Sequence, residues 1–247
     1  MIKYRSGVVR VRKLLLIFFL FLTISVAVSL SFQGEFTYLI ELRILEKRFE
    51  NELIKVDLRI PWLKIAKDVE FSKSLNGEIE ERFTSLVNSV LEDAKWVQND
   101  PLLSSSLPYS LWSRTIVTYL SDELLSCVIY VSHYTGGVHE HLNVFSYTVD
   151  LVERKILKLR DLFNDSFNYE GRIKQYLIEQ IKSQPKMFLP NAVDELRQLN
   201  LEQLAFTVSK VGLTLHFPPY IVSPFSLGIL DITIPWSKFQ DGLKFSF

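Results

Sequence analysis

One stretch of the sequence gathers more side chains able to do chemistry than any other. It reads His133-Tyr134-Thr135-Gly136-Gly137-Val138-His139-Glu140-His141. His139 and His141 are two residues apart, so on a strand both would project from one face and could chelate a metal ion. Glu140 would then point away, and no Cys or carboxylate at a recognisable spacing supplies the third ligand that a zinc site needs. The sequence therefore predicts no metal site, no cofactor and no catalytic residue in this stretch.

The same stretch has two further interpretations. In the first, Gly136-Gly137 forms a loop that needs a positive φ, and the flanking imidazoles form hydrogen bonds. In the second, the loop binds a ligand or a partner protein. The candidate binding residues for that case are Tyr134, Thr135, Gly136, Gly137, His139 and His141.

Other catalytic patterns are missing from the sequence. It contains no Gly-x-Ser-x-Gly elbow, Walker phosphate loop, dinucleotide fingerprint or His-Glu-x-x-His motif. Cys127 is the only cysteine, which excludes an intrachain disulfide, and its apolar surroundings predict a buried core residue. Asp161 is expected to cap a short helical turn. The Pro-rich stretch 217–225 predicts a rigid connection between strands, with an aromatic ligand surface as the alternative.

The N-terminal residues predict export. Five cations precede nine consecutive apolar residues, Leu14 to Leu22, and small residues follow at 27, 29 and 31. This order is typical of a secretory signal peptide, and an uncleaved membrane anchor is the alternative. Under either interpretation of residues 1–31, the body of the protein lies outside the cytoplasmic membrane.

The elements that must position the polar stretch predict an α+β fold, with antiparallel sheets and helices packed on one face. Two strands are expected at 36–48 and 53–60, and the alternating apolar residues of the second predict a half-buried strand that ends at Pro61. Apolar residues three and four apart predict a helix that Asn76 caps. Further strands are expected at 112–120, 124–134, 141–150, 206–209, 213–217 and 229–234, with a second helix at 169–182. The Ser- and Pro-rich loop 99–108 suggests an N-terminal half at 32–108 and a C-terminal domain at 109–247.

The charge distribution argues against nucleic acid as a partner. Five of the 28 Lys and Arg residues precede the first carboxylate, Glu35, so the remaining 23 face 28 Asp and Glu residues. The body of the chain therefore carries a formal charge of about −5, whereas phosphate binding requires a basic surface.

Three segments occur in an order that points to a family. They are Tyr134-Thr135-Gly136-Gly137-Val138-His139, then Asp150-Leu151 with Leu157-Lys158-Leu159-Arg160-Asp161-Leu162-Phe163, and then a tail with Pro219-Tyr220, Ser223-Pro224-Phe225 and Ile234-Pro235-Trp236. From about Leu111 to Leu243 the chain resembles the bacterial extracytoplasmic family called domain of unknown function 3298. Val138 stands where that family commonly has Ala, and Phe225 where it commonly has Tyr. The part before Leu111, with its strand, Pro61 and the helix after Asn76, resembles domain of unknown function 4163.

The resemblance implies an exported module. In relatives it forms the outer part of an anti-sigma factor that binds lysozyme, or it accompanies a peptidoglycan deacetylase domain. Only about thirteen residues precede the apolar run, too few to hold a sigma factor. We therefore expect a periplasmic or otherwise extracytoplasmic, non-catalytic binding module, secreted or anchored to the inner membrane. Its partner would be a peptidoglycan fragment or a lysozyme-like enzyme.

Two alternatives remain open from the sequence. One is a cell-wall hydrolase or deacetylase that uses His133, His139 and His141, with or without a metal ion. The other is a structural envelope protein without a small ligand.

Overall fold

Two β-sheets organise the computed structural model, which describes residues 40–66 and 68–247. The larger sheet has six strands in sequential order: β1 (Ile40–Glu50), β2 (Ile54–Ile65), β3 (Tyr109–Leu120), β4 (Leu124–Tyr134), β5 (His141–Asp150) and β6 (Lys155–Ile156). Neighbouring strands are antiparallel except β2 and β3, which run parallel because helix α1 connects them. The sheet is therefore mixed, which corrects the expectation of purely antiparallel pairing.

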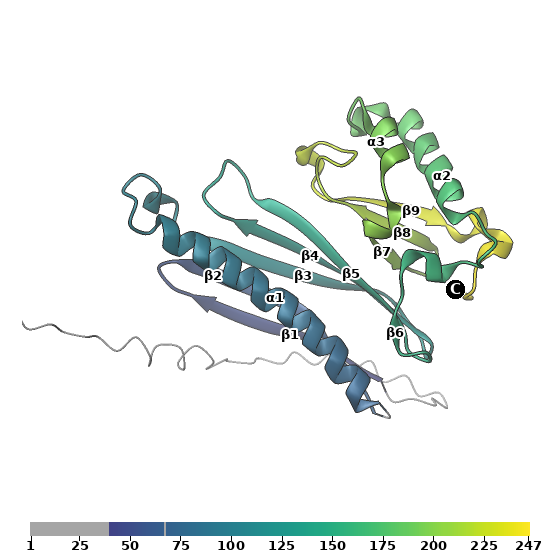
Figure 1. Cartoon of the computed structure of the whole chain (residues 1–247), viewed down its shortest axis with the longest axis horizontal. Coiled ribbons are helices and arrows are strands. Elements are labelled where there is room, and N and C mark those ends of the chain that lie inside the picture. The colour runs from purple at the N-terminus through teal and green to yellow at the C-terminus, as the bar shows by residue number, and fades with distance from the viewer. Residues whose placement is uncertain (1–39, 67) are drawn as a thin grey trace, which may run out of the picture.

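Helix α1 (Val69–Val97) lies along one face of this sheet (Figure 1). Its apolar stripe, including Ile79, Phe83 and Val90, packs into a core with Ile54 and Ile129 of the strands. The helix begins eight residues earlier than the sequence indicated, because Asp68 rather than Asn76 caps it by accepting a hydrogen bond from the Phe71 amide.

Strand β2 continues through Pro61, contrary to the prediction that this residue ends it. Ile44 of β1 is the register partner of Pro61. Arg59 and Leu63 are two residues away from Pro61 on either side, so their amides point to the same side of β2 as its nitrogen. These amides donate to side chains of β3 and α1 and not to β1. The missing N–H of Pro61 therefore falls on the side of β2 that faces β3, and the β2–β3 ladder has already ended at Asp57, so no ladder bond is lost.

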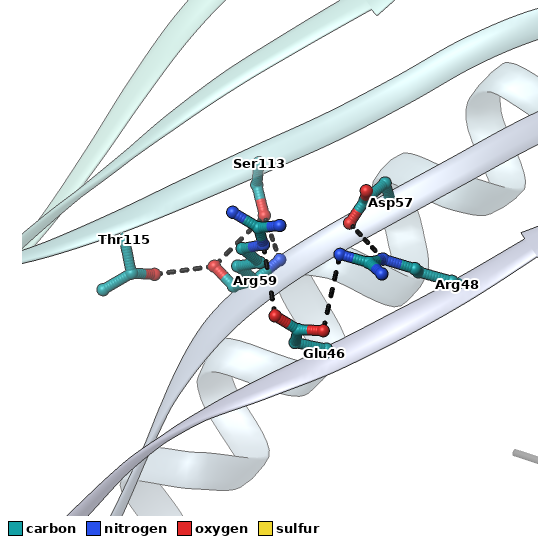
Figure 2. Close-up of polar contacts among 6 residues, drawn as sticks. All are labelled: Glu46, Arg48, Asp57, Arg59, Ser113 and Thr115. Carbon is teal, nitrogen blue, oxygen red and sulfur yellow. Dashed lines mark hydrogen bonds and ion pairs between the residues drawn. The ribbon is translucent and has the colours of Figure 1, made fainter. Parts of the chain in front are cut away.

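Side chains replace the ladder where β2 and β3 diverge beyond Asp57 and Trp112 (Figure 2). The Arg59 amide donates to Ser113 Oγ at 2.9 Å, and Thr115 Oγ1 donates to the Arg59 carbonyl at 2.7 Å. On the exposed side, Arg48 lies between Glu46 and Asp57, and Arg59 also reaches Glu46. These pairs balance the charge of that face.

The C-terminal part forms a second core. Helices α2 (Tyr169–Ser183) and α3 (Ala192–Gln198) cover an antiparallel sheet of β7 (Ala205–Val208), β8 (Gly212–Phe217) and β9 (Leu230–Pro235). Short 3-10 turns connect the elements, at Ser104–Ser106, Leu159–Leu162, Pro185–Met187, Leu201–Gln203, Phe225–Leu227, Trp236–Lys238 and Gln240–Gly242. The turn at Leu159–Leu162 is capped as predicted, because Asp161 Oδ2 accepts from the Lys158 amide.

The small sheet meets the large one along the free edge of β7. The Val208 amide donates to Ser126 Oγ of β4 at 3.1 Å, and the Phe206 amide donates to Ser146 Oγ of β5 at 2.9 Å. Strands on both sides of residue 108 belong to the large sheet, so loop 99–108 joins α1 to β3 within one unit.

The structure confirms the α+β class. No helix of the described part is long and apolar enough to cross a membrane. The predicted signal or anchor at residues 1–31 lies outside the described residues.

Candidate functional site

The predicted polar stretch forms the β4–β5 connection at one end of the large sheet. His133 and His141 are register partners where the two strands meet, and residues 135–140 form the loop between them. Gly136 has φ +84°, and a Cβ there would come within 2.8 Å of Ser106 Oγ. The expectation of a positive φ in this loop is therefore confirmed at Gly136, where the chain passes close to loop 99–108.

The three histidines do not line up on one strand face. The rings of His133 and His141 stack with centroids 4.9 Å apart, whereas His139 lies in the loop, and its ring meets His141 edge-on at 6.3 Å. The expected alternation of His139 and His141 on a strand is wrong, because β5 begins only at His141. Residues 40–66 and 68–247 bring together no group of three or more His, Cys, Asp or Glu side chains that could hold a metal ion.

His133 is held in an environment that disfavours its charged form. Burial, and then the nearby His141, lower the pKa of His133, while Asp93 of α1 acts weakly in the opposite direction. His133 Nδ1 is buried without a hydrogen-bond partner in the described part of the chain. This histidine therefore belongs to the packed side of the loop.

His139 instead joins aromatic residues of the β8–β9 connection. Its ring stacks on Phe225 with centroids 3.9 Å apart, and Phe225 stacks in turn with Tyr220 at 6.1 Å. The Tyr220 hydroxyl lies 3.5 Å from His139 Nε2. Tyr220 is 61% exposed. We call His139, Tyr220 and Phe225 the aromatic platform.

The other predicted binding residues lie beside the platform. Tyr134 is half-buried and meets Tyr109 edge-on at 6.5 Å, and Thr135 is also half-buried. Gly137 and Val138 are exposed at the loop tip, Val138 completely. Tyr220 and Phe225 were not predicted as site residues, although the aromatic residues of the Pro-rich stretch 217–225 were a usable signal.

A second polar group, which the sequence did not indicate, lies between the sheets. Its Thr207 and His216 are buried, whereas its Asp231 side chain is 38% exposed. Asp231 Oδ1 lies 2.8 Å from His216 Nδ1, and His216 Nε2 lies 2.9 Å from Thr207 Oγ1. Tyr130 of β4 donates to the other Asp231 oxygen. Burial and this carboxylate raise the pKa of Tyr130.

Thr207, His216 and Asp231 follow one another like the hydroxyl, imidazole and carboxylate of a catalytic triad. Thr207 is only 1% exposed, however, so no substrate can reach its hydroxyl. The group instead links the two sheets.

Cys127 is buried, as predicted, at 1% exposure. Burial raises the pKa of its thiol to about 12. A thiol of this kind stays protonated and unreactive at neutral pH.

Two models of known families match different parts of the chain. The model "Protein of unknown function (DUF3298)" matches residues 160–237, and the model "Deacetylase PdaC" matches residues 48–140. The resemblance to domain of unknown function 3298 is confirmed, but it starts at residue 160 rather than near Leu111. The segment Tyr134–His139 thus falls within the deacetylase match, and the resemblance to domain 4163 stays a prediction.

Two solved structures share the fold. One is a DUF3298 family member from Bacteroides fragilis NCTC 9343, with a TM-score of 0.65 and 18% identity over 85% of this chain and 96% of that one. The other is a DUF3298 family protein from Pseudomonas aeruginosa PAO1, with a TM-score of 0.55 and 16% identity over 84% and 94%. No curated protein sequence gives a significant match.

Proposed function

We propose that this chain is an extracytoplasmic, non-catalytic module that binds a cell-wall glycan on its aromatic platform. The observation that carries the proposal is the stack of the exposed His139 and Tyr220 with the half-buried Phe225, which joins loops whose residues 139 and 220 are 81 positions apart. Small-molecule sites combine aromatic surfaces with a few polar groups. Here the ring faces can pack on the C–H face of a sugar, while the imidazole and the Tyr220 hydroxyl form hydrogen bonds to its substituents.

The position of the platform supports this function. The β4–β5 loop lies at the end of the large sheet where Glu50, Tyr109 and His141 also lie, whereas Ile40 pairs with Ile65 at the opposite end (Figure 1). The 29 residues of α1 run between these ends, a length of about 40 Å. An anchor formed by residues 1–31 would join the domain at the Ile40 end and direct the platform away from the membrane, toward the wall.

The matching families support the same ligand class. The name of the model that matches residues 48–140 describes a deacetylase, and wall glycans are built from N-acetylated sugars. A module that shares sequence with such a family is suited to hold an acetylated sugar.

Co-sedimentation of the full chain with purified peptidoglycan sacculi tests the proposal. The chain is kept in solution with a polyoxyethylene detergent, because detergents with sugar head groups would compete for the platform. We expect retention on sacculi, and Tyr220→Ala should weaken it at least about tenfold, which corresponds to about 1.4 kcal/mol. Trp96→Ala, which removes a 78% exposed aromatic of α1, is the matched control and should bind normally.

Three outcomes would contradict the proposal. Equal retention of Tyr220→Ala and the wild type would exclude the aromatic platform as the glycan-binding site. If the chain captures a lysozyme-like enzyme but is not retained on sacculi, its ligand is a protein and not a glycan. Release of acetate from sacculi by the purified chain would favour the enzyme alternative with His133, His139 and His141.

A further inference from the structure

A pocket lies at the opposite end of the C-terminal part from the aromatic platform. It is a pocket of about 560 Å³, within the size range of small-molecule sites. The segment before α2 and the segment after β9 form its walls. Gly212 and Pro235 pair at this end of the small sheet, whereas Phe217 and Leu230 pair at the platform end.

The two walls of the pocket are held together by backbone contacts. The Asn164 amide donates to the Gly242 carbonyl at 2.8 Å, and the Lys244 amide donates to the Leu162 carbonyl at 2.9 Å. A Cβ on Gly242 would approach the Phe167 ring to 2.5 Å, so only glycine allows the walls to pack this closely. The pocket is therefore a fixed feature of the fold.

The lining of the pocket combines two cations with neutral donors. Arg172 and Lys238 both line it, and Ser166, Ser237 and Gln240 add hydroxyl and amide groups. Arg172 makes no ion pair with any other described residue, and Lys238 only lies over the Tyr176 ring at 5.8 Å. Among the residues whose side chains the structure describes, none that lines the pocket is a carboxylate. Asp165, next to the pocket, is paired with Lys244 at 2.8 Å.

Two further features suit an anionic ligand with a ring-shaped body. The N-terminal end of α2, which has 15 residues, lies at the pocket and favours negative charge there. Phe167, which is half-buried, contributes apolar surface to the same lining, and the buried Phe239 lies behind it. Arg172 has the planar donor geometry that binds carboxylate or phosphate oxygens in pairs.

We propose that this pocket binds an acidic monosaccharide unit, a sugar that bears a carboxylate or a phosphate. Arg172 and Lys238 bind the acidic group, and Ser166, Ser237 and Gln240 bind the hydroxyls. The ring of Phe167 contacts the apolar face of the sugar. The inference does not rest on the aromatic platform, because different residues at the other end of the small sheet form the two sites.

Calorimetric titration of the full chain with two matched pairs of sugars tests this inference. N-acetylmuramic acid against N-acetylglucosamine tests the carboxylate, and glucose 6-phosphate against glucose tests the phosphate. At least one acidic sugar should bind at least tenfold more tightly than its neutral counterpart, and added salt should weaken that binding. Arg172→Gln and Lys238→Gln should each reduce it at least tenfold.

The controls separate this site from the platform and from general charge effects. Arg172 and Lys238 are exposed, so their replacement leaves the fold intact. Lys182→Gln removes one cation from the other end of α2 and should bind like the wild type, as should Tyr220→Ala. The proposal is overturned if neither acidic sugar binds more tightly than its neutral counterpart, or if Lys182→Gln weakens binding as much as Arg172→Gln does.

Discussion

Gly136 occupies a position in the β4–β5 loop where a side chain meets two obstacles. Its φ of +84° disfavours any residue with a Cβ, and that Cβ would lie 2.8 Å from Ser106 Oγ and 3.1 Å from the Tyr109 hydroxyl. We expect Gly136→Ala to lower the free energy of unfolding by about 1–3 kcal/mol, measured by urea denaturation.

Gly137 provides the matched control for this loop. Its φ is not positive, and a Cβ there would meet only the His139 carbonyl, at 3.7 Å. Gly137→Ala should therefore change stability by less than about 0.5 kcal/mol. A loss at Gly137 as large as that at Gly136 would show that the loop conformation differs from the one described.

His133 should make the stability of the domain depend on pH. Burial and His141 hold its pKa below the ordinary value, so at mildly acidic pH the unfolded chain binds more protons than the folded one. The contribution of His133 to the free energy of unfolding is therefore fully present above about pH 6.5. It is lost as the pH falls through that value toward the lower pKa of the folded state.

His133→Phe tests this assignment. The phenyl ring can still stack on His141, and the substitution breaks no hydrogen bond of the buried Nδ1, which has no partner among the described residues. Denaturation curves at about pH 7.5 and about pH 5 should show a smaller loss for His133→Phe than for the wild type. Equal losses would assign the pH dependence to other groups.

At the scale of elements, periodicity predicted which segments fold and where α2 and the β7–β8 hairpin lie. It failed where a residue contacts another element. Asn76 has the chemistry of a helix cap, yet it lies inside α1 and binds the backbone of Leu63 in β2. Pro61 has the chemistry of a strand end, yet β2 continues because no strand pairs with it on that side. Both errors have one cause, since the local sequence does not contain the neighbouring element.

Asn76 should contribute strongly to the attachment of α1 to the sheet. Its Oδ1 accepts from the Leu63 amide at 2.8 Å, and its Nδ2 donates to the Leu63 carbonyl at 2.7 Å. Asn76→Leu leaves both backbone groups without partners and should cost about 2–3 kcal/mol in thermal or urea unfolding.

Asn88→Leu serves as the control on the same helix, because Asn88 is exposed. It should change stability by less than about 0.5 kcal/mol. If the two variants lose the same stability, helix propensity rather than the contact with Leu63 explains the effect.

At the scale of the whole molecule, the candidate site depends on contacts between distant segments. His139 was predicted as a binding residue from its own neighbourhood, but its ring partner Phe225 comes 86 positions later. Family motifs indicated that both loops matter, and only the packing of the small sheet on the large one shows that they meet. The polar group of Thr207, His216, Asp231 and Tyr130 was missed for the same reason, because its members come from four strands.

A hydrogen bond between Ser126 of β4 and Val208 of β7 joins the two sheets. Ser126 Oγ accepts from the Val208 amide at 3.1 Å and lies 2.9 Å from Thr148 Oγ1, at 0% exposure. Ser126→Ala removes the partner of a buried amide and should cost about 1–3 kcal/mol. Hydrogen exchange followed by mass spectrometry should then be faster in the peptide that covers β7, while α1 keeps its protection. Ser183→Ala, which removes an exposed hydroxyl at the end of α2, should leave β7 unchanged. Unchanged exchange in β7 of Ser126→Ala would mean that apolar packing alone holds the sheets together, and that the platform does not depend on this hydrogen bond.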